Sequence, residues 1–163
     1  MSDASDKLCF LVVDDQPLIT GALSMLLTSE NPDSEVFTAN SVDEARKLVH
    51  SHAPEADLLI LDLSMPGVVG TSLLEEFVRE EPSLKILVLS GVTDRESVMN
   101  TLSLGAAGFV PKTLDTDLLL TAIHFVLKGG VYLPSKIIEE SQRRGFFAEA
   151  GEGIAGRMAS APT

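Results

Sequence analysis

Five short apolar runs alternate with five longer amphipathic stretches, and this alternation constrains the fold more than any other feature of the sequence. The apolar runs cover 8–13, 35–39, 57–61, 85–90 and 108–110, and the amphipathic stretches cover 17–30, 41–51, 70–80, 94–104 and 115–128. Short apolar runs predict buried strands, and the longer stretches predict helices. The continuous run Ile86–Leu89 is typical of a sheet covered on both faces. We therefore predict an α/β domain with a doubly wound, five-stranded parallel sheet.

Residues that start or end helices flank the amphipathic stretches. Pro17 suits a first helical turn, and Ser41 with Glu44 forms a capping box. The expected helix at 94–104 has Thr93 or Asp94 as its candidate N-cap, and the helix at 115–128 has Asp115 or Thr116. Gly129-Gly130 is expected to end the last helix.

The charge balance bears on the class of partner. With 24 acidic and 12 basic side chains, the net charge is -12, so direct binding to a polyanion such as nucleic acid is disfavoured. The sequence has no apolar stretch of 18 residues and no signal-peptide pattern at its start, which predicts a cytoplasmic protein without membrane contact. The single cysteine, Cys9, lies in an apolar run and is expected to be a buried core residue.

Composition divides the chain into three parts. We expect residues 1–6 to be a flexible N-terminus, 7–130 to form the folded domain, and 131–163 to be a helical linker with a flexible tail. Within that last part, 135–148 could form a helix, and 149–163 is rich in Gly, Ala and Ser.

Acidic residues follow two of the expected strands. Asp14 and Asp15 follow the first apolar run, and Asp62 follows the third. In a doubly wound sheet of order 2-1-3-4-5 those strand ends adjoin, at the edge where ligands bind. Three crowded carboxylates repel one another, and Mg²⁺ is the natural compensating cation.

The ends of the fourth and fifth runs carry Ser90 and Lys112. A hydroxyl and an ammonium group next to a metal ion form an arrangement that stabilises a phosphoryl group. Each residue alone has a simpler interpretation, as a turn, a solvated side chain or a helix cap; the combination is the signal.

With these positions in order, the chain resembles a response-regulator receiver domain over roughly residues 7–130. The matching segments are Asp14-Asp15, Asp62 to Gly67, Ser90-Gly91, and Phe109 to Lys112. The resemblance implies a flavodoxin-like or CheY-like fold. The ending Gly129 to Pro134 is similar to LuxR/NarL-type regulators, in which a linker leads to a DNA-binding domain.

The resemblance implies a role for each pocket residue. Asp62 would accept a phosphoryl group from the phosphohistidine of a sensor histidine kinase. Asp15, Asp62 and the backbone carbonyl of Ser64 would bind Mg²⁺ directly, and Asp14 would hold it through water.

Ser90 and Lys112 would contact the phosphoryl oxygens. Phe109 would be the switch aromatic that turns inward when Ser90 moves toward the phosphoryl group.

One departure concerns the residue after the lysine. Receivers often have a cis proline there, whereas this chain has Thr113. If the geometry is kept, the Lys112–Thr113 peptide bond is cis at a cost of about 3–4 kcal/mol.

The expected function is a phosphorylation-activated receiver, not an enzyme, that relays a signal to transcription. It would form a homodimer on phosphorylation and reach DNA through an output domain absent from this sequence. The alternatives are a stand-alone regulator and a phosphorylation-independent interaction module. Two other classes fit less well: haloacid-dehalogenase-type phosphatases need a second acid where Ser64 stands, and flavodoxins need a phosphate-binding loop where Asp14-Asp15 would repel phosphate.

Overall fold

The computed structural model describes residues 7–112 and 115–134, and they form one five-stranded parallel sheet in the order β2-β1-β3-β4-β5. The predicted order is confirmed. The strands are β1 (Cys9–Val13), β2 (Glu35–Ala39), β3 (Leu58–Asp62), β4 (Ile86–Ser90) and β5 (Gly108–Pro111).

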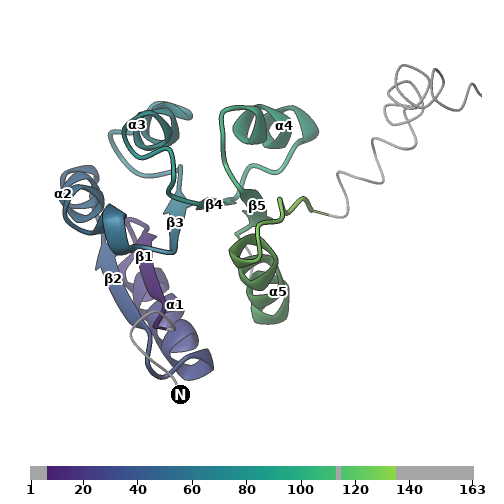
Figure 1. Ribbon diagram of the computed structural model, residues 1–163. Coiled ribbons are helices and arrows are strands. Elements are labelled where there is room, and N and C mark those ends of the chain that lie inside the picture. The colour runs from purple at the N-terminus through teal and green to yellow at the C-terminus, as the bar shows by residue number, and fades with distance from the viewer. Residues whose placement is uncertain (1–6, 113–114, 135–163) are drawn as a thin grey trace, which may run out of the picture.

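Helices cover both faces of this sheet. They are α1 (Pro17–Glu30), α2 (Val42–His52), α3 (Ser72–Glu80), α4 (Arg95–Ser103) and α5 (Thr116–Leu127), with a short 3-10 helix, η2 (Ala53–Glu55), after α2. Figure 1 shows α1 and α5 on one face and α2, α3 and α4 on the other. The five strands and five helices predicted between residues 8 and 128 are present, with ends within two residues of the prediction. The short helix η2, which contains Pro54, was not predicted from the sequence.

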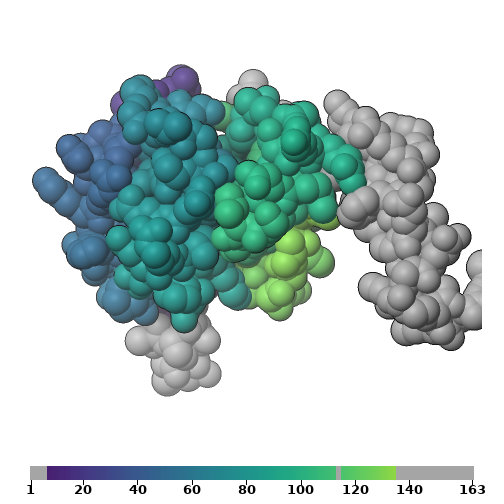
Figure 2. Space-filling model, turned by 90° about the horizontal axis from the view of Figure 1, so that it is seen from above, coloured from purple at the N-terminus to yellow at the C-terminus, as the bar shows by residue number. Residues whose placement is uncertain are grey.

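The core has two parts, one on each face of the sheet. One cluster joins β-strand side chains such as Leu59 and Val88 to the α2–α4 layer, and the other joins Ile60 and Leu87 to α1 and α5. Figure 2 looks onto the α2–α4 layer. β1, β3 and β4 are buried along their whole lengths. This explains their continuous apolar sequences.

Helix caps follow the predicted chemistry. Ser41 Oγ accepts a hydrogen bond from Glu44 N at 3.1 Å, and Asp94 and Asp115 cap α4 and α5. Gly129, at φ +98°, follows the end of α5 in a conformation that other residues rarely adopt.

Cys9 is buried, as predicted, with 5% of its surface exposed. Burial, together with the charges of Glu55, Glu35 and Asp57, raises the pKa of its thiol to about 11. The thiolate is the reactive form. We therefore expect Cys9 to resist iodoacetamide at pH 8 in the folded chain and to react in denaturant. Rapid labelling of the folded chain, followed by intact mass, would contradict this burial.

Some expectations fall on other residues. The N-terminal segment 1–6, the helix at 135–148, the flexible tail at 149–163 and the cis Lys112–Thr113 bond lie outside the described residues, wholly or in part. Among the residues described, no helix is long and apolar enough to cross a membrane.

Candidate functional site

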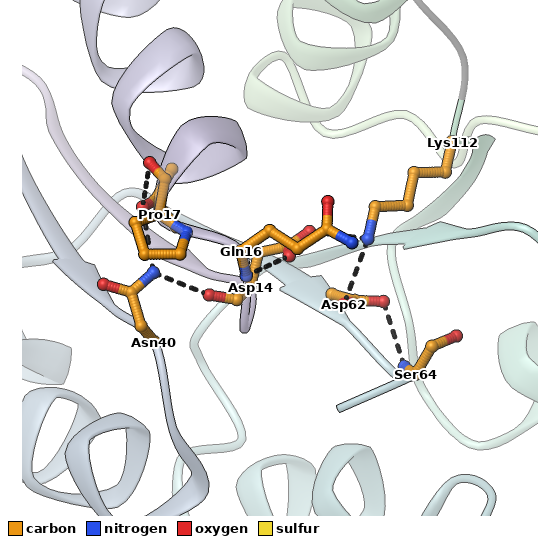
Figure 3. A network of polar contacts seen from close by, with 8 residues as sticks. Asp14, Gln16, Pro17, Asn40, Asp62, Ser64 and Lys112 are labelled. Carbon is orange, nitrogen blue, oxygen red and sulfur yellow. Dashed lines mark hydrogen bonds and ion pairs between the residues drawn. The ribbon is translucent and has the colours of Figure 1, made fainter. Parts of the chain in front are cut away.

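Two buried aspartates lie side by side at the carboxyl edge of the sheet. β1 and β3 pair directly, with Val13 opposite Leu61, so the next residues, Asp14 and Asp62, are neighbours. Their exposed fractions are 1% and 0%. Backbone N–H groups of the following loops hold both carboxylates: Gln16 N donates to Asp14 Oδ1, and Ser64 N donates to Asp62 Oδ1, each at 2.9 Å. Figure 3 shows both contacts.

Lys112 bridges the two aspartates from the end of β5. Its Nζ lies 2.9 Å from Asp14 Oδ2 and 3.2 Å from Asp62 Oδ2. In Figure 3 the lysine side chain extends across the site toward Asp62. Because β5 is two strands away from β3 in the sheet, the long lysine side chain is what brings its charge to this position.

The charges in the site alter one another's protonation. Burial raises the pKa of Asp14, and the contact with Lys112 opposes that effect only in part. Burial alone would lower the pKa of Lys112, but its close contacts with the negative charges of Asp14 and Asp62 outweigh that effect and raise the pKa. Lys112 is therefore held as a cation between the two aspartates.

Asp15 completes a set of three carboxylates. One oxygen each from Asp14, Asp15 and Asp62 lies within 4.8 Å of the other two. Asp14 Oδ2 is buried and accepts no hydrogen bond from the described part of the chain, although Lys112 lies close to it. A buried oxygen with spare capacity in an all-oxygen donor set fits a small divalent cation such as Mg²⁺.

Ser90 and Phe109 lie beside this site and line a common pocket. Ser90 is 5% exposed, and its Oγ accepts a hydrogen bond from Val92 N at 3.0 Å. Phe109 is 1% exposed. The pocket has a volume of about 350 Å³ and reaches from these two residues to the start of α3 and to α4; it also includes Ser64, Thr71, Asn100 and Thr101. The side chains of Ser90 and Phe109 therefore adjoin open space.

Asn40, directly after β2, supports the site and was not among the predicted site residues. Its Nδ2 donates to the backbone carbonyl of Asp14 at 2.8 Å (Figure 3). The same Nδ2 donates to Thr20 Oγ1 at 3.0 Å. It thereby ties the loop after β1 to β2 and α1. Asn40 directly follows the second apolar run, so the rule that singled out the other strand ends could have found it.

Comparison with known proteins agrees with this geometry. The family model described as the response regulator receiver domain matches residues 10–124. The Glycerol metabolism activator of Pseudomonas putida is 34% identical over 135 residues, which cover 83% of this chain and 61% of that protein. The first curated relatives are matched over 55–61% of their own length.

Two solved structures show the same fold. A LuxR family DNA-binding response regulator from Silicibacter pomeroyi is 28% identical, with a TM-score of 0.67 over 80% of this chain and 98% of that chain. The CheX-CheY-BeF3-Mg+2 complex from Borrelia burgdorferi is 27% identical, with a TM-score of 0.68 over 73% of this chain and 88% of that chain. With a matching family model over most of the described fold, and with relatives of the LuxR/NarL type, this chain belongs to the response regulator receiver domain family of two-component systems.

Proposed function

We propose that Asp62 accepts a phosphoryl group from a phosphohistidine on a sensor histidine kinase. The observation that carries this proposal is the bridge from Lys112 to two fully buried aspartates, with a third carboxylate alongside. A buried carboxylate at an open edge, next to a fixed cation, is an activated oxygen nucleophile with a partner for the incoming negative charge.

The transfer balances as a displacement at phosphorus. An Asp62 oxygen forms the new O–P bond, the P–N bond to the donor histidine breaks, and the leaving imidazole keeps the electron pair and takes a proton. Lys112 pairs with the phosphoryl oxygens as a point charge, and Ser90 donates its hydroxyl hydrogen to one of them. A bound Mg²⁺ would be held by Asp14, Asp15, Asp62 and the backbone carbonyl of Ser64. There it would supply positive charge that offsets the negative charge of the transferred group.

The same site supplies a switch. Ser90 Oγ now accepts from Val92 N, and a phosphoryl group on Asp62 would draw the hydroxyl away from that contact. Phe109 shares the 350 Å³ pocket with Ser90, so it has space to change position with it. The change would bias the surface formed by α4, β5 and α5 between two states.

We further propose that this receiver, residues 7–130, controls transcription in the cytoplasm, as part of a regulator that dimerises on phosphorylation and contacts DNA through another domain. The LuxR-type relative supports this output. The net charge of -12 argues against DNA contact by the receiver itself. Phosphoryl transfer to its own side chain does not make the domain a multiple-turnover enzyme.

The direct test is the intact mass of the full chain after incubation with acetyl phosphate. We expect one added phosphoryl group with Mg²⁺ and none when EDTA replaces it, because the buried carboxylates need a counter-charge. If neither acetyl phosphate nor a panel of histidine kinases phosphorylates the chain, the phosphorylation-independent interaction module is the better description.

Replacing Asp14 by Asn is expected to stabilise the metal-free chain and to weaken its binding of Mg²⁺. Because burial raises the pKa of Asp14, its charge is unfavourable in the folded chain without metal, and removing it should raise the melting temperature in EDTA. The same change should reduce the stabilisation that Mg²⁺ gives. Thermal unfolding across a Mg²⁺ titration measures both effects, and an unchanged Mg²⁺ response would remove Asp14 from the metal site.

A further inference from the structure

The residues after α5 return to the edge of the sheet. Tyr132 forms a parallel β-bridge with Gly108 of β5. Tyr132 N donates to Ala107 O at 3.0 Å, and Phe109 N donates to Tyr132 O at 3.1 Å. Since β5 is the last strand of the sheet, Tyr132 adds a single bridge residue to its outer edge. Figure 1 shows this segment beside β5, between α4 and α5.

This segment packs against both faces of the sheet. Tyr132 contacts the core cluster on the α1 and α5 face, and Leu133 contacts the cluster on the opposite face, which includes Phe109. Pro134 is buried. In Figure 2 the yellow-green surface of these residues lies next to the green surface of α4. The sequence analysis assigned 131–134 to the linker, whereas in the structure these residues are packed on the domain.

Two glycines make room for the close approach. A Cβ atom at Gly108 would lie 2.8 Å from Leu87 Cδ1 and 3.1 Å from Tyr132 Cβ. At Gly130 a Cβ would collide with the ring of Phe125. Any larger residue at either position must displace its neighbours, so the segment depends on glycine at both.

We propose that residues 131–134 are a coupling segment that positions Phe109 and links it to the chain beyond Pro134. The inference rests on the proposed function and extends it. Phe109 lines the same pocket as Ser90, and its backbone N–H donates a hydrogen bond to the carbonyl of Tyr132. A change at Ser90 therefore reaches the outgoing chain through one side chain and one hydrogen bond.

The bridge between Tyr132 and Gly108 also sets the direction of the outgoing chain. Because it is parallel, Leu133 and Pro134 continue in the direction of β5, toward the sheet edge that carries Asp62, Ser90 and Lys112. Tyr132 already occupies the outward-facing backbone groups of this edge, the carbonyl of Ala107 and the N–H of Phe109. A partner of the α4–β5–α5 surface would therefore contact side chains there and could not add a strand beside these two residues.

The test is amide hydrogen exchange in the full chain, residue by residue, with and without beryllofluoride and Mg²⁺ as a phosphoryl mimic. Ser64 N, which donates to Asp62, reports occupancy of the site. We expect exchange at Ser64 to change, and exchange at Phe109 and Tyr132 to change together in one direction by similar factors. A response at Ser64 without one at Tyr132 overturns the coupling and leaves the proposed function standing. No response at Ser64 overturns both.

Gly108→Ala breaks the contact without touching the acceptor site. We expect exchange at Tyr132 to accelerate about three- to tenfold, the effect of one weakened hydrogen bond, and its response to beryllofluoride to disappear while that of Ser64 remains. Gly21→Ala is the matched control, because a Cβ there meets nothing within 4 Å. If exchange at Tyr132 accelerates in Gly108→Ala while Phe109 still responds to beryllofluoride as in the native chain, residues 131–134 do not position Phe109. If Gly108→Ala does not fold, the exchange measurements on the native chain with and without beryllofluoride test the proposal by themselves.

Discussion

Replacing Asp62 by Asn is expected to abolish phosphoryl incorporation from acetyl phosphate with Mg²⁺, down to the detection limit of intact mass. The amide has nearly the same shape, and its oxygen can still accept the hydrogen bond from Ser64 N, which is 2.9 Å long in the native chain. It lacks the anionic oxygen that must attack phosphorus, so the loss is chemical and not structural.

Asp57→Asn is the matched control for this experiment. Asp57 directly precedes β3, at the strand end opposite Asp62, and its Oδ2 accepts a hydrogen bond from Cys9 N at 2.8 Å, which an amide oxygen can also do. The Asp57 variant should be phosphorylated like the native chain. Full incorporation in Asp62→Asn, mapped to another residue, would show that Asp62 is not the acceptor.

Replacing Lys112 by Ala should have the second large effect, this time on stability. The change leaves two carboxylates, 1% and 0% exposed, without their shared cation. Removing one partner from a buried ion pair costs about 3–5 kcal/mol. We expect a loss of that order in the free energy of unfolding in EDTA at pH 7, much of it recovered with Mg²⁺, which supplies the missing positive charge. Urea unfolding with and without Mg²⁺ measures both values.

Lys128→Ala provides the comparison for general loss of a lysine, because Lys128 is exposed after the end of α5. Its effect should be small and independent of Mg²⁺. If Lys112→Ala is as stable as Lys128→Ala in EDTA, Lys112 does not stabilise the folded chain by compensating the two buried aspartates.

Much of the fold could be predicted from the sequence because the buried strands consist of continuous apolar runs. Runs such as Leu58–Leu61 admit few other interpretations once helical stretches separate them. The order of strands followed from a rule on doubly wound sheets, and it placed Asp14 and Asp62 next to each other. Lys112 could be assigned to the same edge, but only the structure shows that it contacts both aspartates, at 2.9 and 3.2 Å.

The contacts that sequence reasoning missed depend on tertiary approach. Asn40 is one polar residue after a strand, and nothing local shows that its amide reaches the carbonyl of Asp14. The bridge from Tyr132 to Gly108 joins residues brought together by the turn after α5, and a Gly-Gly pair predicts only that the helix stops. Periodic patterns of apolar residues identify helices and strands, whereas a single hydrogen bond between distant residues leaves no such pattern in the sequence.

The shared lysine also determines which cations can complete the pocket. Three carboxylates and one ammonium group leave an excess of two negative charges at neutral pH when all four groups are ionised. A divalent ion cancels this excess, whereas one sodium or potassium ion leaves half of it in a buried space. A preference for divalent over monovalent cations thus arises from electroneutrality alone, before ligand number or ion radius has any influence.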